Sequence, residues 1–467
     1  MTANRCSRRD FLRTTGAAAV SALMPLSAHA AKRHRPNIIL MFADDHAQES
    51  MGYAGNPVIK TPNMDRLAAD GVFFENSFVT TPICCCSRAS VLTGQYMRRH
   101  GIEDFRKPLS AEAFAQTYPM ILRDAGYRTA YLGKFAIGRP DKDIKHLSLP
   151  ADKFDFWYGF PQDFSFKQNV GGETCYLTDL MTTKAIDFMK STPKDQPFCM
   201  TLAFKEPHGP LDYFDPDFPK YYEDTEIPRP KTLTQEAYDK MPDFIRHSLN
   251  GSGDTCRFLN NDTYQSYMRQ IYNYVSRLDQ AVGVVMDALH AVGLAENTIV
   301  IYASDNGSFL GAHGLSEKWL LYEESIRVPL IVWDGRLPKR RRGIRHEAIA
   351  LNIDWAPTML DYAGVPIPET MQGKSLRPLV EGAKKAVRKD AYFEHTYVHQ
   401  NNIRSSEGVR SKDWKYIRYF RQEPVYEELF HLTNDPEESH NLTGDAKQAS
   451  SLKRLRARCD EFRRTLA

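Results

Sequence analysis

The run from Cys84 to Arg88, Cys-Cys-Cys-Ser-Arg, contains the residues with the clearest capacity for chemistry. Cys84 is expected at a turn that opens a helix, where free backbone N–H groups and the helix dipole favour negative charge. Arg88 lies one helical turn further on, so its guanidinium can reach the same point. This arrangement suits a nucleophile that acts through a covalent intermediate. The three thiols could instead be small buried hydrophobes, whereas three contiguous thiols cannot easily converge on one metal ion.

Acidic and amide side chains follow two expected strands. Asp44 and Asp45 come directly after one buried apolar run, and Asp305 and Asn306 come directly after another. Ligands of open α/β sheets bind at the carboxyl ends of the strands, so these side chains are expected at one edge. Carboxylate and amide oxygens suit Ca²⁺ better than Zn²⁺. Taken singly, the acidic pair could cap a helix, and Asp-Asn-Gly could form a turn.

Apolar, β-rich runs alternate with helical patterns, which predicts a large, mostly parallel sheet sandwiched by helices in an α/β fold. Apolar residues recur at three- and four-residue steps from Tyr267 to Val285 and predict a long helix. The stretch 207–262 is expected to be a surface insertion that could shape a pocket. The expected strands are residues 37–43, 127–132, 198–204, 298–303 and 330–333.

A smaller region is expected to follow. Strand-like runs at 390–393, 409–419 and 425–432 predict a small antiparallel sheet, and an apolar stripe from Leu452 to Leu466 predicts a terminal helix. We therefore expect a catalytic domain over residues 36–381 and a C-terminal subdomain over residues 382–467.

The N-terminus has the order of an export signal. The twin arginines Arg8 and Arg9 precede a weakly apolar run, 14–26, and the small-residue site around Ala30. This predicts a twin-arginine signal peptide over residues 1–30, and hence an exported protein of the bacterial periplasm or exterior that uses the twin-arginine machinery. The apolar run is too short to span a bilayer, and no other stretch is long enough. A basic amphipathic helix is the alternative.

The composition is that of a globular protein. With 467 residues, 42% apolar and 25% charged, the chain is long enough for one large domain and a smaller one. The net charge of +3 gives no reason to expect nucleic acid. The cysteines beyond the expected signal match no small disulfide framework, and a pair such as Cys175 with Cys256 stays open.

Several segments occur in a characteristic order along the chain. They are Cys84 to Arg88 with the pattern C-x-[PAC]-S-R, Tyr131 to Gly138, Phe204 to Pro210, Lys318-Trp319 with Tyr322 to Pro329, and Trp414 to Ile417 with Glu428 to Phe430 and Asp435-Pro436. In this order they resemble the type I sulfatases of the alkaline phosphatase-like superfamily. The resemblance runs from about Pro36 to Leu442 and implies the α/β fold of that superfamily and a sulfuric ester hydrolase.

The resemblance also implies the chemistry at Cys84. A separate formylglycine-generating enzyme would oxidise this cysteine to formylglycine. One hydroxyl of the hydrated aldehyde would take the sulfuryl group, and the other would later lose its proton and expel sulfate. Ca²⁺ would be held by the modified Cys84 together with Asp44, Asp45, Asp305 and Asn306.

The same resemblance assigns roles to the basic residues. Lys134 and Lys318 would contact the sulfate and bridging oxygens, and Arg88 would hold the diol or a metal-bound oxygen. His208 would be the general acid for the departing alcohol. Ala136 departs from the pattern, because the family has a histidine there that triggers sulfate release. His46, His100 or His313 could substitute for it, release could depend on water, or turnover could be slow.

The substrate is expected to be a sulfated small molecule or glycan, most plausibly a carbohydrate sulfate. Tyr213, Tyr221, Tyr222 and Arg257 in the insertion could contact sugars and sulfates, and the basic run 339–342 could attract a polyanion or be a solvated loop. Two alternatives are a phosphonate or phosphate diester hydrolase with the same nucleophile, and a catalytically impaired protein that binds sulfated glycans.

Overall fold

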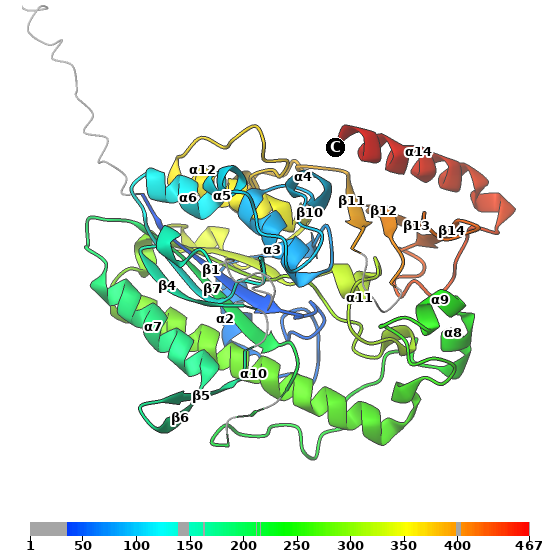
Figure 1. The fold of residues 1–467 in the computed structure, drawn as a ribbon, viewed down its shortest axis with the longest axis horizontal. Helices are drawn as coiled ribbons and strands as arrows, with labels where there is room; N and C mark the ends of the chain where they lie inside the picture. The colour runs from blue at the N-terminus through cyan, green and yellow to red at the C-terminus, as the bar shows by residue number, and fades with distance from the viewer. Residues whose placement is uncertain are drawn as a thin grey trace, which may run out of the picture. The chain divides into compact units, whose positions relative to one another are not determined.

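The computed structural model describes residues 35–138, 149–161, 164–211, 213–214, 216–397 and 403–466. The expected signal peptide lies outside these ranges. The main strands are β1 (Asn37–Asp44), β2 (Val72–Phe78), β3 (Arg128–Lys134), β4 (Phe156–Phe160), β7 (Phe198–Pro207), β8 (Thr298–Ser304), β9 (Leu330–Asp334) and β10 (Ile344–Leu351). They form one eight-stranded sheet in the order β10-β2-β9-β8-β1-β7-β3-β4 (Figure 1).

The sheet is mostly parallel, as the sequence predicts. All five expected strands form, as β1, β3, β7, β8 and β9. β1 pairs in parallel with both β7 and β8, so the strands that carry the predicted site residues lie at the centre of the sheet. β9 is antiparallel to both β8 and β2. The strands β2, β4 and β10 were not predicted.

Helices cover both faces of this sheet (Figure 1). β1 shows the two layers, because Ile38, Leu40 and Phe42 join one core cluster while Ile39 and Met41 join the other. One face carries α2 (Pro62–Ala69), α7 (Leu177–Ser191) and α10 (Asn261–Ala291), and the other carries α3 (Cys84–Thr93), α6 (Tyr118–Asp124) and α12 (Trp355–Ala363). The long helix α10 contains the predicted periodic stretch.

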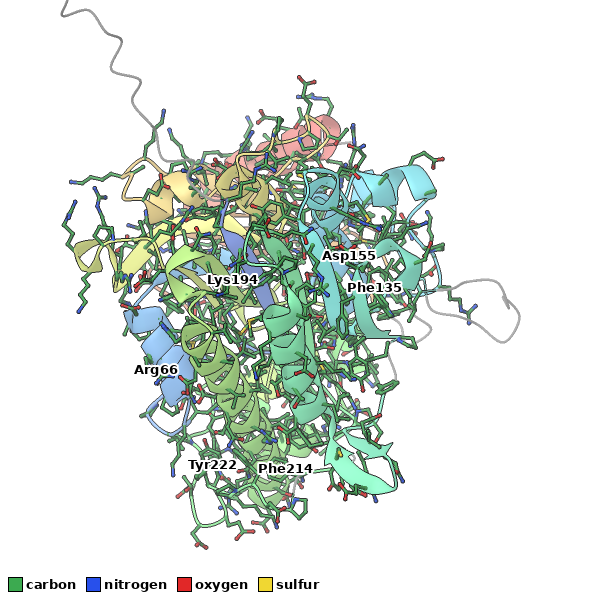
Figure 2. The ribbon with its side chains drawn as sticks, turned by 90° about the vertical axis from the view of Figure 1, so that its left-hand side faces the viewer. Arg66, Phe135, Asp155, Lys194, Phe214 and Tyr222 are labelled. Carbon is green, nitrogen blue, oxygen red and sulfur yellow. The ribbon has the colours of Figure 1, made fainter. Side chains whose placement is uncertain are left out.

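The insertion after β7 is mostly irregular, as expected, and lies along α10. Figure 2 shows Phe214 and Tyr222 beside this helix. The short elements of the described chain include α4 (Met97–His100), α5 (Ala111–Ala115), β5 (Lys167–Val170), β6 (Glu173–Tyr176), α8 (Gln235–Lys240), α9 (Asp243–Arg246), η2 (Arg257–Leu259), η4 (Ala312–Gly314), α11 (Glu323–Ile326) and α13 (Arg377–Val380).

A four-stranded antiparallel sheet near the C-terminus confirms the second expected region. Its strands, in spatial order, are β11 (Asp390–His395), β12 (Ser406–Ser411), β13 (Trp414–Tyr419) and β14 (Tyr426–His431). The expectation of one run over 409–419 is wrong, because the chain turns at Lys412 and Asp413 and continues as a second strand. Helix α14 (Ala449–Thr465) packs on β12 and β13 through Leu452, Leu455 and Cys459. Residues 35–467 form one compact unit, and the boundary at 382 stays a prediction.

The described residues contain no helix with the length and apolar character that crossing a membrane requires. The seven cysteines of this part of the chain are free thiols. Cys256 donates its Sγ–H to the Gly314 carbonyl over 3.4 Å, so the pair of Cys175 with Cys256 is not formed.

Candidate active site

Cys84 is the first residue of α3, and its side chain is fully buried. Ile83 is extended, so the chain passes from an extended segment into the helix at this point. The Cys84 Sγ–H donates to Oδ1 of Asp44 over 3.4 Å. Burial, together with the nearby charge of Asp44, raises the pKa of the Cys84 thiol well above its ordinary value. The unmodified side chain is therefore a neutral thiol at neutral pH, which is a weak nucleophile.

The acidic side chains meet at one edge of the sheet, as expected. β1 and β8 are parallel neighbours, with Ala43 opposite Ser304. Asp44, Asp45 and Asp305 therefore leave the sheet side by side. The backbone N–H of Asp45 donates to Oδ1 of Asp305 over 3.2 Å, and that of Asp305 donates to the Ala43 carbonyl over 3.1 Å. These bonds fix the two strand ends to each other.

Arg88 joins the helix to the acidic strand ends. Its Nη2 lies 2.8 Å from Oδ2 of Asp305 and 3.5 Å from Oδ2 of Asp44. Its Nη1 donates to the Lys134 carbonyl over 2.5 Å. The guanidinium also lies 4.7 Å from the centre of the Phe42 ring. Arg88 is thus a buried cation that positions the carboxylates.

The two lysines complete the ion pairs. Lys134, at the end of β3, contacts Asp44, and the Lys318 Nζ lies 2.5 Å from Oδ1 of Asp45. Burial favours the neutral amine, but Asp44 outweighs it and raises the pKa of Lys134. Burial likewise favours the neutral amine of Lys318, but Asp45 outweighs burial and raises the pKa of Lys318. Both lysines therefore stay charged and can bind an anionic oxygen.

The two innermost carboxyl groups differ in their proton affinity. Burial acts to raise the pKa of Asp44, but Lys134 and other basic neighbours outweigh it and hold this pKa well below the ordinary value. Burial and the charge of Asp44 raise the pKa of Asp305 to about 7. The difference arises because two carboxylates close together cannot both ionise freely.

His208 lies at the open side of the cluster, in the segment that follows β7. Its Nε2 is 3.8 Å from Oδ2 of Asp45. Its Nδ1 contacts the Gly209 carbonyl, which can only accept, so Nδ1 carries the proton and Nε2 carries a lone pair in the neutral ring. Burial, with the charges of Lys134 and Lys318, lowers the pKa of His208 to about 4. The ring is therefore neutral at neutral pH and accepts a proton at Nε2.

The donor set fits a metal ion. One ligand atom from each of Asp44, Asp45, Cys84 and His208 lies within 4.8 Å of the others. Asn306 adds an oxygen, because its Nδ2 donates to Asp45 while its buried Oδ1 has no hydrogen-bond partner in the described residues. His208 belongs to this group, although it was not among the predicted ligands. Asp305 is tied to the group because its oxygens accept from the Asp45 N–H and from Arg88, and each oxygen keeps a second lone pair.

The chain is similar to known proteins over most of its length. Residues 36–365 match the family model described as sulfatase. The chain belongs to the sulfatase family. Residues 311–465 also match the model of the N-sulphoglucosamine sulphohydrolase C-terminal region. The chain is thus a sulfuric ester hydrolase, as the resemblance implied.

Relatives of this sulfatase include enzymes with defined names. An N-acetylglucosamine-6-O-sulfatase from Bacteroides thetaiotaomicron is 31% identical and covers 90% of this chain and 85% of its own. A structure solved in complex with its substrate D-glucosamine-2-N,6-O-disulfate is 29% identical, with a TM-score of 0.79 over 92% of this chain and 98% of its own. The phosphonate monoester hydrolase of Agrobacterium radiobacter, at 21% identity, has a TM-score of 0.79 over 93% of this chain and 96% of its own, which shows the shared fold.

Ala136 sits beyond β3 in this sulfatase, 1% exposed and with φ 60°. Each of the three histidines considered as a replacement for the missing one is held elsewhere. His46 Nδ1 lies 2.7 Å from the Tyr302 hydroxyl, and its Nε2 lies 2.9 Å from the Ser50 carbonyl. His100 Nε2 lies 3.1 Å from Ser90 Oγ. His313 Nε2 lies 3.4 Å from Glu324 Oε1. The structure therefore gives none of them contact with the cluster around Cys84.

Asn250, in the insertion, holds the segment that carries Lys318 and was not predicted. Its Nδ2 donates to the Ser316 carbonyl over 2.8 Å and also to the Lys318 carbonyl. Its own carbonyl accepts from the Ser316 N–H over 2.8 Å. Lys318 lies between Glu317 and Trp319, which have φ 63° and 82°, so this backbone needs external support. No sequence pattern signals bonds across so many residues.

The insertion residues expected to contact sugars differ in their exposure. Tyr222 is 1% exposed, and its hydroxyl lies 2.7 Å from Ser276 Oγ, so the expectation that it stacks on a sugar is wrong. Tyr221 is exposed and lies under the Lys60 ammonium, and Tyr213 packs near Tyr176. Arg257 is exposed at η2.

Proposed function

We propose that this sulfatase hydrolyses a sulfate ester on a carbohydrate, using formylglycine made from Cys84 and a Ca²⁺ ion. Two comparisons support the carbohydrate substrate: the relative named N-acetylglucosamine-6-O-sulfatase and the structure that holds a disulfated glucosamine. The geometry of the site supports the proposed reaction, and the comparisons support the substrate class.

The observation that carries the proposal is the state of Cys84. Burial keeps its thiol neutral, while the residue stands at a helix N-terminus among Arg88, Lys134 and Lys318. A neutral thiol is a poor nucleophile, but these cations and N–H groups suit an attacking group that takes up a sulfuryl anion. Oxidation to formylglycine would supply the hydroxyls that the thiol lacks.

Ca²⁺ is the ion that we assign to this site. Asp44, Asp45, Asp305 and Asn306 would hold it through oxygen atoms, together with the modified Cys84. The ion would polarise a sulfate oxygen and acidify the attacking hydroxyl. The unpartnered Oδ1 of Asn306 supports the assignment, because a buried carbonyl oxygen is otherwise costly.

Other residues of the chain would bind the sulfate, position the site and transfer protons. Lys134 and Lys318 hold sulfate oxygens, and Arg88 keeps the carboxylates and the helix start in register. His208 Nε2 can take the proton of the attacking hydroxyl and pass it to the alcohol oxygen as the sulfur–oxygen bond breaks. The same nitrogen is then free to accept the proton whose loss expels sulfate, the step that the family gives to a histidine at the position of Ala136.

Two measurements test this proposal. Mass spectrometry of the peptide containing Cys84, after co-expression with a formylglycine-generating enzyme, should show the aldehyde. Parallel assays should show turnover of N-acetylglucosamine 6-sulfate above that of a phosphonate monoester and a phosphate diester. Faster turnover of the phosphorus esters would favour the first alternative. Tight binding of sulfated sugar without turnover in the aldehyde-containing protein would favour an impaired glycan-binding protein, the alternative that Ala136 suggests.

We also propose that residues 1–30 direct export through the twin-arginine machinery to the periplasm or beyond, and that residues 36–381 and 382–467 are the catalytic domain and the C-terminal subdomain. The paired substitution of Arg8 and Arg9 by lysine should keep the protein in the cytoplasm, as measured by cell fractionation. Normal export of this variant would contradict the assignment.

A further inference from the structure

Burial shows from which side a substrate reaches Cys84. The side chains of Cys84, Asp44 and Asp305 are fully buried, whereas 22% of the His208 side chain and 13% of the Asp45 side chain are exposed. A sulfate ester must therefore approach across Asp45 and His208. A cavity of about 670 Å³ beside α10, lined by Phe214, Glu226 and Arg269 among others, contains none of the site residues and is a separate feature.

Tyr267 of α10 lies beside this approach. The phenol is half-buried, and burial together with the nearby charges of Glu317 and Asp45 raises its pKa. Within the part of the chain that the structure describes, its hydroxyl has no hydrogen-bond partner. The ring lies 5.2 Å from that of Phe258, which fixes its position. Tyr267 thus offers an aromatic face and a free hydroxyl next to the ion pair that would bind sulfate.

Arg257 continues the same surface outward. It is exposed, and its guanidinium lies 4.6 Å from the centre of the Phe258 ring. Among the described residues no carboxylate lies within 4.0 Å of it, although its charge acts on both Tyr267 and Glu317. An exposed guanidinium without a partner, held against an aromatic ring, is well placed to bind an external anion.

Glu317 completes the group on the other flank. It directly precedes Lys318, and its side chain is exposed. The Asn250 bonds that hold Ser316 and Lys318 fix the backbone on both sides of Glu317. A carboxylate at this place can accept hydrogen bonds from sugar hydroxyl or N–H groups.

We propose that Arg257, Tyr267 and Glu317 form a recognition site for the sugar that bears the sulfate ester, and that Arg257 binds a second sulfate on that sugar. The inference rests on the proposed carbohydrate sulfatase function. The sugar ring stacks on Tyr267, its polar groups bond to Glu317, and its second anionic group pairs with Arg257. The enzyme therefore prefers a doubly sulfated amino sugar over its singly sulfated counterpart.

The test compares two sugars that differ at one position, D-glucosamine-2-N,6-O-disulfate and N-acetylglucosamine 6-sulfate. Arg257→Gln should lower kcat/KM for the disulfate by about tenfold to a hundredfold, as expected for a lost hydrogen bond to a charged group, and should lower it less for the monosulfate. Arg257→Lys keeps the charge and should recover part of the preference. Arg340→Gln removes an exposed charge of the basic run and is the matched control, which should leave the preference between the sugars unchanged.

Equal losses on both sugars, or the same loss in Arg340→Gln, would overturn the assignment of Arg257. A wild-type enzyme that hydrolyses neither sugar would overturn the proposed function instead. Calorimetric binding to the full-length Cys84→Ala protein then decides the recognition site separately. Tighter binding of the disulfate that Arg257→Gln removes supports it, and equal affinity for the two sugars contradicts it.

Discussion

Two clusters of buried charges can be compared in this sulfatase. The first is the catalytic cluster around Asp44, Asp45 and Asp305. The second, which we name the docking cluster, consists of Glu323, Arg410, Lys415 and Glu438 and joins α11 to the C-terminal sheet. In the docking cluster, Lys415 Nζ lies 2.8 Å from Glu323 Oε1 and 2.7 Å from Glu438 Oε1.

Buried acids with a shifted pKa do not by themselves mark an active site. Burial raises the pKa of Glu438 to about 7, the same value as that of Asp305. What distinguishes the catalytic cluster is its surroundings: strand ends, a helix N-terminus at Cys84 and the unpartnered oxygen of Asn306. In the docking cluster, cations from the C-terminal sheet pair with Glu323 of α11, so its charges hold two parts of the molecule together.

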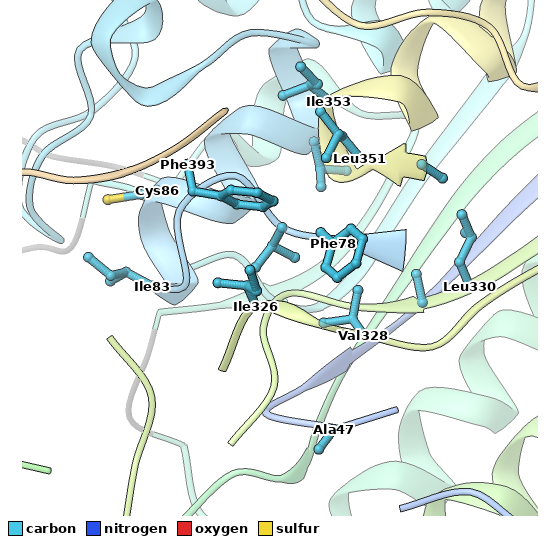
Figure 3. Packing of buried hydrophobic residues seen from close by; sticks show 14 of the residues in the cluster. Ala47, Phe78, Ile83, Cys86, Ile326, Val328, Leu330, Leu351, Ile353 and Phe393 are labelled. Carbon is cyan, nitrogen blue, oxygen red and sulfur yellow. The ribbon is translucent and has the colours of Figure 1, made fainter. Parts of the chain in front are cut away.

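The largest effect on turnover should come from Cys84→Ala. Loss of the nucleophile should lower kcat by at least about 10⁴-fold. Cys86→Ala is the control, because Cys86 lies with Ile83 and Phe393 in the apolar cluster of Figure 3 and should retain measurable activity. Steady-state assays of both variants after co-expression with a formylglycine-generating enzyme give the answer. An equal loss of kcat in both variants would contradict the assignment of Cys84 as the nucleophile.

Metal removal should have the next largest effect. Chelation should abolish activity, and Ca²⁺ should restore it better than Zn²⁺, because the ligands are mainly oxygens. Asp45→Asn should weaken Ca²⁺ binding by at least about a hundredfold in titration calorimetry. Glu438→Gln removes a carboxylate from the docking cluster and should leave Ca²⁺ affinity unchanged. Full activity in thoroughly chelated enzyme would exclude the metal site.

The absence of a histidine at residue 136 should appear in the kinetics. In the proposed mechanism His208 serves two proton transfers, so rapid mixing should show a burst of alcohol followed by a slow steady rate. Ala136→His returns a base and should raise the steady rate by about a hundredfold. Histidine tolerates the φ of 60° at this position better than most residues. Wild-type enzyme without a burst, together with a slower Ala136→His variant, would show that another residue already acts as the base.

Asn250→Ala should have a smaller effect, about tenfold on kcat, because it removes hydrogen bonds that position Lys318. Purely structural damage would lower activity in any background. We therefore expect Asn250→Ala to change little in a Lys318→Ala protein. Gln265→Ala, which removes the insertion's bonds to Ile227, is the matched control and should leave kcat largely intact. A further loss in the Lys318→Ala background would assign Asn250 to folding alone.

The smallest effect on turnover should come from the docking cluster. Lys415→Met leaves Glu438 without its cation and Glu323 with Arg410 alone, and should cost about 3–5 kcal/mol of unfolding free energy, with kcat of the folded protein little changed. Lys412→Met breaks an exposed pair with Glu347 and should cost less than about 1 kcal/mol. Denaturant unfolding and assays at low temperature measure both quantities. A kcat loss as large as that of Cys84→Ala would erase the distinction between the clusters.

The sequence predicts those parts of the site that lie on regular elements. Asp44 and Asp305 end apolar strands that are easy to recognise, so their meeting follows from parallel pairing. β2 was missed because Glu75, Asn76 and Ser77 interrupt its apolar run. Tyr267 was assigned to an apolar helix stripe, and that pattern concealed its position beside Lys318. Asn250 acts through bonds to residues far along the chain, which no local pattern contains.

The burial of Cys84 has a consequence for the order of events in the cell. Its side chain is fully covered at the start of α3, so a folded molecule presents no sulfur atom to a modifying enzyme. The proposed oxidation would therefore take place on a chain whose helix has not yet packed against the sheet. The proposed twin-arginine route carries folded cargo, so the modification would be complete before the protein leaves the cytoplasm. Molecules that fold before the proposed oxidation would keep the neutral thiol at Cys84 and would stay inactive.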